Sequence, residues 1–403
     1  MLFENEKIEF DEKSIGIMNI ADNEINEKYI LGEVRIVTEQ ARYPLNTITM
    51  MIDSKNYELN PDFQRRRRWD DVKKSKLIES FIMNVPIPPV FLYENEFSHY
   101  EVMDGLQRLS TIYDFYNDSF KLVGLQLWPE LNGRYYSNLP EKIRKGVDRR
   151  YISSIILLQE SAKSKEEAQG MKQLVFERIN SGGVKLEGQE TRNALYNGKM
   201  NQMCLQLSRN KYLCAMLDIP HEELELQISF IYDINSLLLQ NERYKKMEDV
   251  EYVLRFFAMR QIDGYANRTL SEFLDMYLKK TNFYDDSTLN SLRALFEETI
   301  EFAFDLFGSS AFYMWRKRST NYSDESWNWF SRATTTIYDP LMHVLSKMIY
   351  SKDILLKNKE IIRNEVKNFY QENYDAFEGR SSNKNDIEKR IVLFENFFKS
   401  YLE

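Results

Sequence analysis

Residues 99–116 read HYEVMDGLQRLSTIYDFY, and the change of pattern inside this stretch decides the fold of the first half of the chain. His99–Met103 is apolar and strand-like, whereas a helical pattern opens within Asp104–Arg108. In that pattern, apolar and aromatic side chains recur at three- and four-residue spacing: Leu106, Leu109, Ile112, Tyr113 and Tyr116. The stretch therefore predicts a strand that leads directly into a helix with one packed face.

The pentapeptide DGLQR at this junction is the first candidate for a binding site. We expect Asp104 to be the N-cap, and Gly105 to let a ligand approach the backbone closely. Arg108 falls in the first turn, where the helix dipole disfavours a cation by roughly 0.3–1 kcal/mol. An anion bound at the helix N-terminus would explain that arginine. The alternative is a solvated arginine beside an ordinary aspartate cap.

Upstream, Leu59–Asp70 reads LNPDFQRRRRWD. Pro61 predicts a loop or extended segment, because proline biases the preceding residue away from helix. Four consecutive arginines cannot all face a core, so this run is either a phosphate or nucleic-acid patch or a solvated basic turn. The candidate residues here are Gln64, Arg65, Arg66, Arg67 and Arg68.

Strands and helices alternate irregularly as far as residue 200, which predicts an α+β domain. We expect helices at 43–54, 73–83, 140–146, 165–179 and 186–196, and strands at 90–93, 120–123 and 151–158. The glycine loop Asn180–Gly183 ends one of these helices.

The second half of the sequence is almost wholly helical, with expected helices such as 250–259, 270–278, 289–307 and 340–348. We find no strand-rich stretch there. Residues 1–40 are acidic and irregular, and predict an arm or a small addition to the α+β domain. The expected organisation is an arm at 1–40, an α+β domain at 41–200 and a helical domain at 201–403.

Composition excludes several classes of protein. The 403 residues are 43% hydrophobic and 29% charged, as in ordinary soluble proteins. A net charge of -8 argues against general coating of nucleic acid or of anionic membranes, but allows a local basic site. Two cysteines are too few for a disulfide framework or a cysteine zinc site. We see neither a signal peptide nor a membrane span, and expect a soluble, cytoplasmic protein.

Well-known catalytic motifs are absent from the sequence. Gly183–Gly188 has the glycine spacing of a P-loop, but Gln189 occupies the position of the lysine. Neither H-E-x-x-H nor G-x-S-x-G occurs. The three histidines are far apart in the sequence, so we expect structural or surface roles for them, no metal site and no HNH-type nuclease.

Three polar clusters remain, each at a junction between elements, where sites are often assembled. They are Gln64 and Arg65; Asp104, Gln107 and Arg108; and Asn180, Glu190, Arg192 and Asn193. Arginine grips phosphate in a bidentate fork, and an amide can read a base edge or orient a water molecule. The clusters therefore suit an anionic, hydrogen-bond-rich ligand such as a nucleotide.

At these residues the sequence resembles the DGQQR-motif family, the N-terminal NTPase half of GmrSD-type modification-dependent restriction enzymes, which also occurs as stand-alone proteins. The motifs are LNPDFQR…W (59–69), LIES (77–80), VPIPP (85–89), VMDGLQRL (102–109), FERINSGG (176–183) and QETRNA (189–194). Pieces at 247–258 and 306–308 resemble longer members, so the likeness extends from about residue 40 to near the C-terminus.

The resemblance implies a ParB/sulfiredoxin-like mixed α/β domain followed by a mainly helical domain. It also implies hydrolysis of a nucleoside triphosphate of unknown identity, with Mg²⁺ as a possible cofactor, in defence against foreign DNA. Asp104, Gln107 and Arg108 would contact phosphate or the attacking water, and the remaining nucleotide contacts would be Gln64, Arg65, Gly105, Asn180, Glu190, Arg192 and Asn193. DNA would lie against Arg66, Arg67 and Arg68.

Two departures from the family pattern affect these expectations. Leu106 replaces the first glutamine of DGQQR, and the sequence lacks the HNH half. We therefore expect any cleavage of double-stranded DNA to need a partner nuclease, and a homo-oligomer is possible. Two alternatives stay open: a nucleotide- or DNA-binding sensor without turnover, and a ParB-like nuclease.

Overall fold

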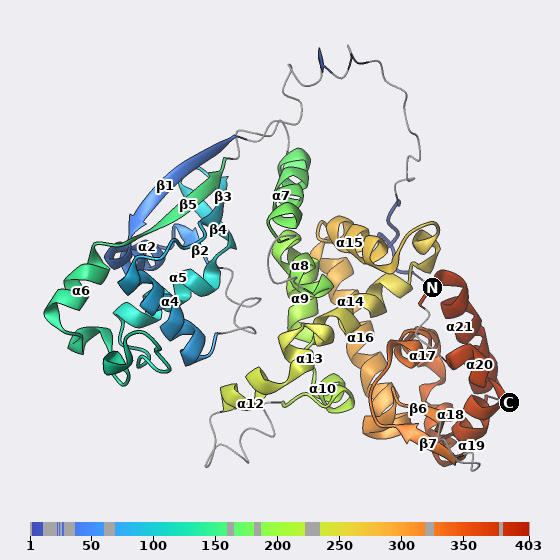
Figure 1. Cartoon of the computed structure of the whole chain (residues 1–403). Helices are drawn as coiled ribbons and strands as arrows, with labels where there is room; N and C mark the ends of the chain where they lie inside the picture. The colour runs from blue at the N-terminus through green and yellow to red at the C-terminus, as the bar shows by residue number, and fades with distance from the viewer. Residues whose placement is uncertain are drawn as a thin grey trace. The chain divides into compact units, whose positions relative to one another are not determined.

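The computed structural model describes residues 2–10, 22, 24, 26–27, 37–59, 69–158, 165–180, 187–221, 234–318, 326–378 and 382–402. The chain forms two compact units (Figure 1). One contains residues 15–186, and we call it the sheet unit. The other, the helical unit, contains residues 187–403 together with residues 1–14. Each unit is described by itself.

The sheet unit is built on a mixed five-stranded sheet with the strand order β1-β5-β3-β4-β2. The pairs β1–β5 and β3–β4 are antiparallel, whereas β3–β5 and β2–β4 are parallel. The strands are β1 (Thr38–Pro44), β2 (Tyr57–Glu58), β3 (Val90–Glu96), β4 (His99–Asp104) and β5 (Tyr151–Leu157). The expected α+β class is confirmed.

Helices cover one face of this sheet, as Figure 1 shows for α2, α4 and α5. They are α2 (Ile48–Asp53), α4 (Asp71–Met83), α5 (Leu106–Tyr116) and α6 (Glu141–Asp148). Leu92 and Val102 are paired across β3 and β4, and both lie in the core under these helices. The helix predicted from the pattern after Asp104 is confirmed as α5, and its Leu109, Ile112 and Phe115 are fully buried.

The opposite face of the sheet contacts α7 (Lys165–Asn180). Side chains alternate between faces along a strand, so Tyr93 and its partner Glu101 point away from the helix-covered core. The Nζ atom of Lys172 on α7 lies 2.6 Å from Glu101 Oε2 and 5.5 Å from the centre of the Tyr93 ring. This ion pair fixes α7 against the second face.

One strand prediction and one helix boundary in this unit are wrong. Residues 120–123 form an irregular segment, although Phe120 and Leu122 are buried. The helix predicted at 43–54 is shorter, because Thr38–Pro44 forms β1 and the α-helix begins at Ile48.

The helical unit contains most of the helices expected from the second half of the sequence. Its α-helices are α8 (Gly188–Leu195), α9 (Lys199–Leu207), α10 (Lys211–Leu217), α12 (Ile234–Gln240), α13 (Glu242–Lys245), α14 (Glu248–Met259), α15 (Leu270–Thr281), α16 (Asp286–Phe307), α17 (Thr335–Lys347), α18 (Lys352–Lys357), α19 (Lys359–Glu372), α20 (Tyr374–Phe377) and α21 (Lys384–Lys399). Helix α8, which the sequence analysis assigned to the first domain, packs here against α14 and α15.

An unexpected antiparallel hairpin interrupts the helices, formed by β6 (Met314–Arg318) and β7 (Ser326–Phe330). The helix expected to begin at Pro340 begins earlier, so the proline lies inside α17.

The core of the helical unit surrounds α14. Every residue from 252 to 259 is at most 5% exposed, so this helix is enclosed on all sides. The buried Arg255 makes two hydrogen bonds to Asp339 of α17, which satisfies both charges. Residues 2–10 also dock on this unit, where Glu6 is fully buried and bonds to Arg260.

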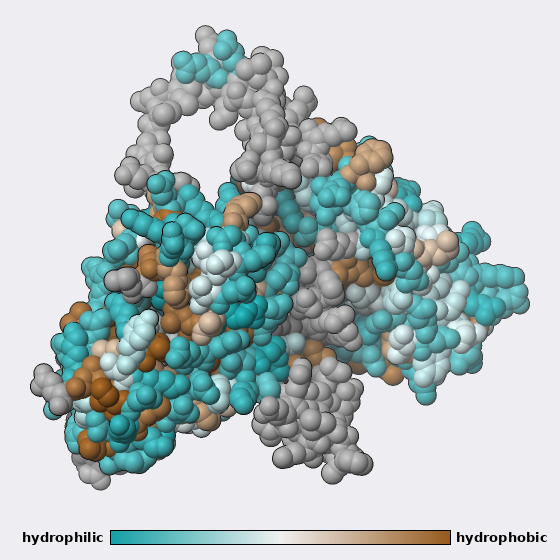
Figure 2. Space-filling model, turned by 180° about the vertical axis from the view of Figure 1, so that it is seen from behind, coloured by the Kyte–Doolittle hydropathy of each residue, from teal (hydrophilic) through white to brown (hydrophobic). Residues whose placement is uncertain are grey.

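The surface shown in Figure 2 is mostly hydrophilic, with hydrophobic residues in small separate areas. Within the part of the chain that the structure describes, no helix combines the length and the apolar character needed to cross a membrane.

Candidate functional site

The candidate site lies where β4 leads into α5, and Gly105 determines its shape. Its φ of 96° lies in the left-handed region, which L residues with side chains rarely adopt. A Cβ atom at this position would lie 2.4 Å from Val90 Cγ1 on the neighbouring strand. Gly105 is therefore required both by the backbone conformation and by the close approach of β3.

The structure corrects our assignment of the helix cap. Gly105, not Asp104, is the N-cap of α5, and no side chain accepts a hydrogen bond at this cap. Asp104 is the last residue of β4, and its Oδ2 accepts a 2.5 Å hydrogen bond from Arg108 Nη2. The first turn of α5 thus lacks the side-chain cap that the sequence predicted.

Arg108 is held in place by two acceptors. Its Nη2 bonds to Asp104, and its Nη1 donates to the carbonyl oxygen of Pro88 at 2.8 Å. The arginine side chain is 12% exposed and the aspartate side chain 40%. From the sequence, a bound anion or solvation of the arginine explained a cation in this first turn. In the structure the Asp104 carboxylate, four residues earlier, offsets the unfavourable interaction of Arg108 with the helix dipole.

Leu106 and Gln107 point in different directions. Leu106 is 8% exposed and belongs to the hydrophobic core of the sheet unit. The Gln107 Oε1 atom accepts a 3.1 Å hydrogen bond from the backbone N–H of Trp69. The departure from DGQQR at Leu106 therefore falls on a position that packs inward.

The described residues on either side of the arginine run contact β4 and α5. Before it, Tyr57 of β2 pairs with Tyr100 of β4, and after it Trp69 bonds to Gln107. The candidates Gln64, Arg65, Arg66, Arg67 and Arg68 lie outside the described residues. Sequence reasoning missed the backbone contacts that flank this run, because a main-chain N–H has no residue-type signature.

The third predicted cluster is distributed over both units. Asn180 is the last residue of α7 in the sheet unit, and its side chain lies outside the described part of the chain. Glu190, Arg192 and Asn193 lie on α8 in the helical unit, and each is at most 3% exposed. The structure therefore does not bring the cluster together within either unit.

Arg192 is committed to contacts inside the helical unit. Its Nε lies 2.7 Å from Asp275 Oδ1, and its Nη1 lies 3.0 Å from Glu251 Oε2. Its Nη2 donates to Ser271 Oγ at 3.0 Å. All three nitrogens of the guanidinium thus have partners on α14 and α15, an arrangement typical of a structural arginine.

The two other α8 candidates also have local partners. Glu190 Oε2 accepts from the backbone N–H of Glu187 and completes a capping box. Asn193 Oδ1 accepts from Asn201 Nδ2, while the buried Asn193 Nδ2 has no hydrogen-bond partner among the residues that the structure describes. Across the described ranges, no group of three or more His, Cys, Asp or Glu side chains could hold a metal ion.

A comparison with family models identifies the segment that contains the site. Residues 48–197 match the model described as GmrSD restriction endonuclease, N-terminal domain. The resemblance expected from the motifs is therefore confirmed for this segment. The match begins at α2 and ends just beyond α8. No curated protein and no solved structure matches the chain.

Proposed function

We propose that this chain binds a nucleoside triphosphate at the first turn of α5 and hydrolyses it as part of a restriction system directed against foreign DNA. The observation that carries the proposal is Gly105, whose missing side chain leaves an N-terminal turn without a side-chain cap. Backbone N–H groups at such a turn point towards a bound phosphate, and the helix dipole favours its charge. The match to a GmrSD N-terminal domain supports the restriction role.

Under this proposal, Asp104 and Pro88 pre-orient Arg108, so that little entropy is lost when it meets a phosphate. Gln107 adjoins the same turn and would contact phosphate or the attacking water. If Mg²⁺ accompanies the nucleotide, Asp104 is the nearby carboxylate that would face it, since its side chain is 40% exposed. Gln64 and Arg65 would add phosphate contacts, Arg66–Arg68 would meet DNA, and a partner nuclease would cut it.

The test is release of phosphate from each of the four ribonucleoside triphosphates, with and without double-stranded DNA. We expect turnover by the wild type and a loss of at least about a hundredfold in Arg108→Ala, as for other removed phosphate-stabilising groups. Arg149→Ala is the matched control, because Arg149 is an exposed arginine of the same unit. Equal turnover in both variants would contradict the assignment.

A sensor without turnover is the second candidate, and one contact favours it. The Gln107 side-chain oxygen already accepts from Trp69 N–H, which ties the amide to the backbone and leaves one lone pair of this oxygen for a water molecule. A sensor would show nucleotide-dependent thermal stabilisation that Arg108→Ala abolishes, without release of phosphate. The two readouts, measured on the same samples, separate the candidates.

A further inference from the structure

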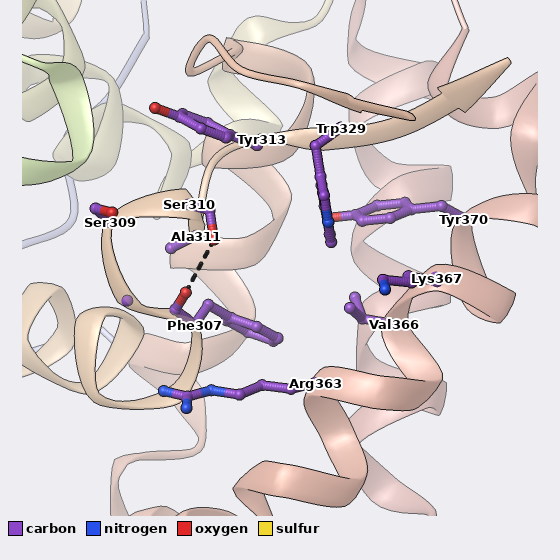
Figure 3. Close-up of a pocket in the computed structure, with 11 residues that line it drawn as sticks. Phe307, Ser309, Ser310, Ala311, Tyr313, Trp329, Arg363, Val366, Lys367 and Tyr370 are labelled. Carbon is purple, nitrogen blue, oxygen red and sulfur yellow. Dashed lines mark hydrogen bonds between the residues drawn. The ribbon is translucent and has the colours of Figure 1, made fainter. Parts of the chain in front are cut away.

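The helical unit contains a cavity of about 360 Å³, far in sequence from the candidate residues on α5, α7 and α8. It lies between the end of α16, the β6–β7 hairpin and α19 (Figure 3). Its size falls within the range of pockets that hold small molecules, about 300–1,000 Å³. The chemistry of its lining decides which kind of molecule fits.

Aromatic rings form much of the lining. Figure 3 shows the indole of Trp329 edge-on, with Tyr370 on one side and Phe307, Ser310 and Tyr313 on the other. The Trp329 ring meets Tyr370 in a T-shaped contact, with 6.3 Å between ring centres. The Trp329 indole lines the cavity, where a planar ring could stack on it.

Tyr370 supplies an unused hydrogen-bonding group. The residue is 2% exposed, yet its hydroxyl has no hydrogen-bond partner among the described residues. Burial raises the pKa of this hydroxyl, so it stays protonated and able to donate. In Figure 3 the hydroxyl end of the ring is directed towards Trp329 and the cavity. An acceptor on a ligand in the cavity would give this hydroxyl a hydrogen-bond partner.

Two cations of the lining, Arg363 and Lys367, lie on α19, the helix that also carries Tyr370. Lys367 is exposed, and in the described part of the chain no carboxylate pairs with it; its Nζ lies 5.1 Å from the centre of the Trp315 ring. Arg363 donates to the backbone oxygens of Leu306 and Asp305 at the end of α16. Lys367 is therefore the cation available to an anionic ligand.

The adjacent hairpin repeats this mixture of rings and positive charges. Strand β6 reads MWRKR and β7 reads SWNWF. The register places Trp315 opposite Trp329 and Lys317 opposite Trp327. Interleaved aromatic and basic side chains are the usual means of binding nucleic-acid strands, since rings stack on bases and cations meet phosphates.

We propose that this cavity binds a nucleobase together with the phosphate attached to it, supplied either by a free mononucleotide or by one unit of a single strand. The base stacks on Trp329 and accepts from the Tyr370 hydroxyl, and Lys367 pairs with the phosphate. Arg363 and Lys367 exclude a positively charged ligand, and the polar Tyr370 hydroxyl disfavours a wholly apolar one. The site is independent of the nucleotide site proposed at α5.

The experiment uses the full chain carrying Arg108→Ala, so that the α5 site does not contribute. The probes are a fluorescein-labelled oligodeoxythymidine of about twelve nucleotides, read by anisotropy, and thymidine monophosphate, read by calorimetry. We expect at least one probe to bind, and Tyr370→Phe and Lys367→Ala each to weaken it by about tenfold. Lys389→Ala, at an exposed lysine on α21, is the matched control and should bind as the parent does.

Tyr370→Phe keeps the fold, because the hydroxyl that it removes has no partner to lose. Binding of the strand alone identifies a nucleic-acid site, and binding of the monophosphate alone identifies a small-molecule site; both support the proposal. Absence of binding by both probes overturns it. So does binding that Tyr370→Phe and Lys367→Ala leave at the level of Lys389→Ala.

Discussion

Gly105 controls the candidate site through two separate effects, backbone conformation and space. Gly133 isolates the first, because it also has positive φ, 83°, but no atom within 4 Å of an added Cβ. We expect Gly133→Ala to cost about 1–2 kcal/mol of unfolding free energy. Gly105→Ala should cost a further 1–3 kcal/mol or so, because its Cβ collides with Val90. Urea denaturation of both variants measures the difference, and equal losses would contradict the steric effect.

His343 predicts a dependence of stability on pH. It is 8% exposed on α17, and burial lowers its pKa to about 3, with Lys347 and Arg260 contributing. The unfolded chain binds a proton near the ordinary pKa of about 6.5, whereas the folded chain does not. The stabilisation from neutral His343 is therefore complete above pH 6.5 and is lost as the pH falls towards 3. At pH 5 the loss is about 2 kcal/mol.

The test compares unfolding free energies at pH 7 and pH 5. His343→Leu should lose about 2 kcal/mol less than the wild type over this interval, because the titrating group is gone. His99→Leu, at an exposed histidine, should lose as much as the wild type does. Equal losses of unfolding free energy in all three proteins would show that His343 binds a proton as readily in the folded state as in the unfolded state.

Single residues also show how far the sequence could predict the site. The DGLQR junction was predictable, because a strand pattern changes to a helical one there. From the sequence, Gly105 was expected to admit a ligand, whereas the structure requires glycine for its left-handed φ and for the nearby Val90 side chain. The N-cap of α5 was not predictable. An aspartate at position 104 can either cap a helix or pair with Arg108 four residues later, and the sequence is compatible with both roles. The Pro88 carbonyl that holds Arg108 lies twenty residues away and carries no sequence signal.

At the scale of elements, α8 depends on Arg192 for its attachment to α14 and α15. Removing the buried Arg192 leaves Glu251 and Asp275, whose side chains are about a third exposed, without this partner, at a cost of about 1–3 kcal/mol. We expect Arg192→Ala to destabilise the helical unit by this amount, while nucleotide binding at α5 persists. Thr191→Ala, at the preceding residue of the same helix, is the control. Loss of nucleotide binding without loss of stability would restore Arg192 to the nucleotide site.

The elements that the sequence missed share a weak hydrophobic signal. Strand β1 is mostly exposed, and β6 consists largely of cations, so neither shows clear alternation. The segment 120–123 shows a clear hydrophobic alternation but does not form a strand. Phe120 and Leu122 are buried alternately, as in a strand, but Leu122 N–H bonds to the Arg134 carbonyl and Val123 N–H to the Ser75 hydroxyl. Long helices such as α16 were predictable because their periodicity persists over several turns.

At the scale of the whole molecule, residues 2–10 and residues 187–403 belong to the same helical unit, and the sheet unit is formed by the residues between them. Nε and Nη2 of Arg260 donate hydrogen bonds of 2.6 and 2.7 Å to the Glu6 carboxylate. The Glu6 carbonyl accepts from Gln261 and Tyr284, and the Phe10 ring packs on Phe273 with 5.6 Å between ring centres. Acidic sequence in an irregular arm gave no sign of this long-range contact.

Glu6→Ala should release this N-terminal arm, because it leaves Arg260 without its bidentate partner in a buried site. We expect faster amide exchange at residues 2–10 and at α14, measured by mass spectrometry, with little change in β3 to β5.

Gly264→Ala acts on the other end of the arm: its Cβ would lie 2.2 Å from the Phe10 ring, so it should give the same exchange pattern. Glu4→Ala, at an exposed glutamate of the arm, should leave exchange unchanged. If Glu6→Ala and Gly264→Ala instead retain full protection at residues 2–10, the arm does not depend on these contacts, and the helical unit does not need the chain's first residues.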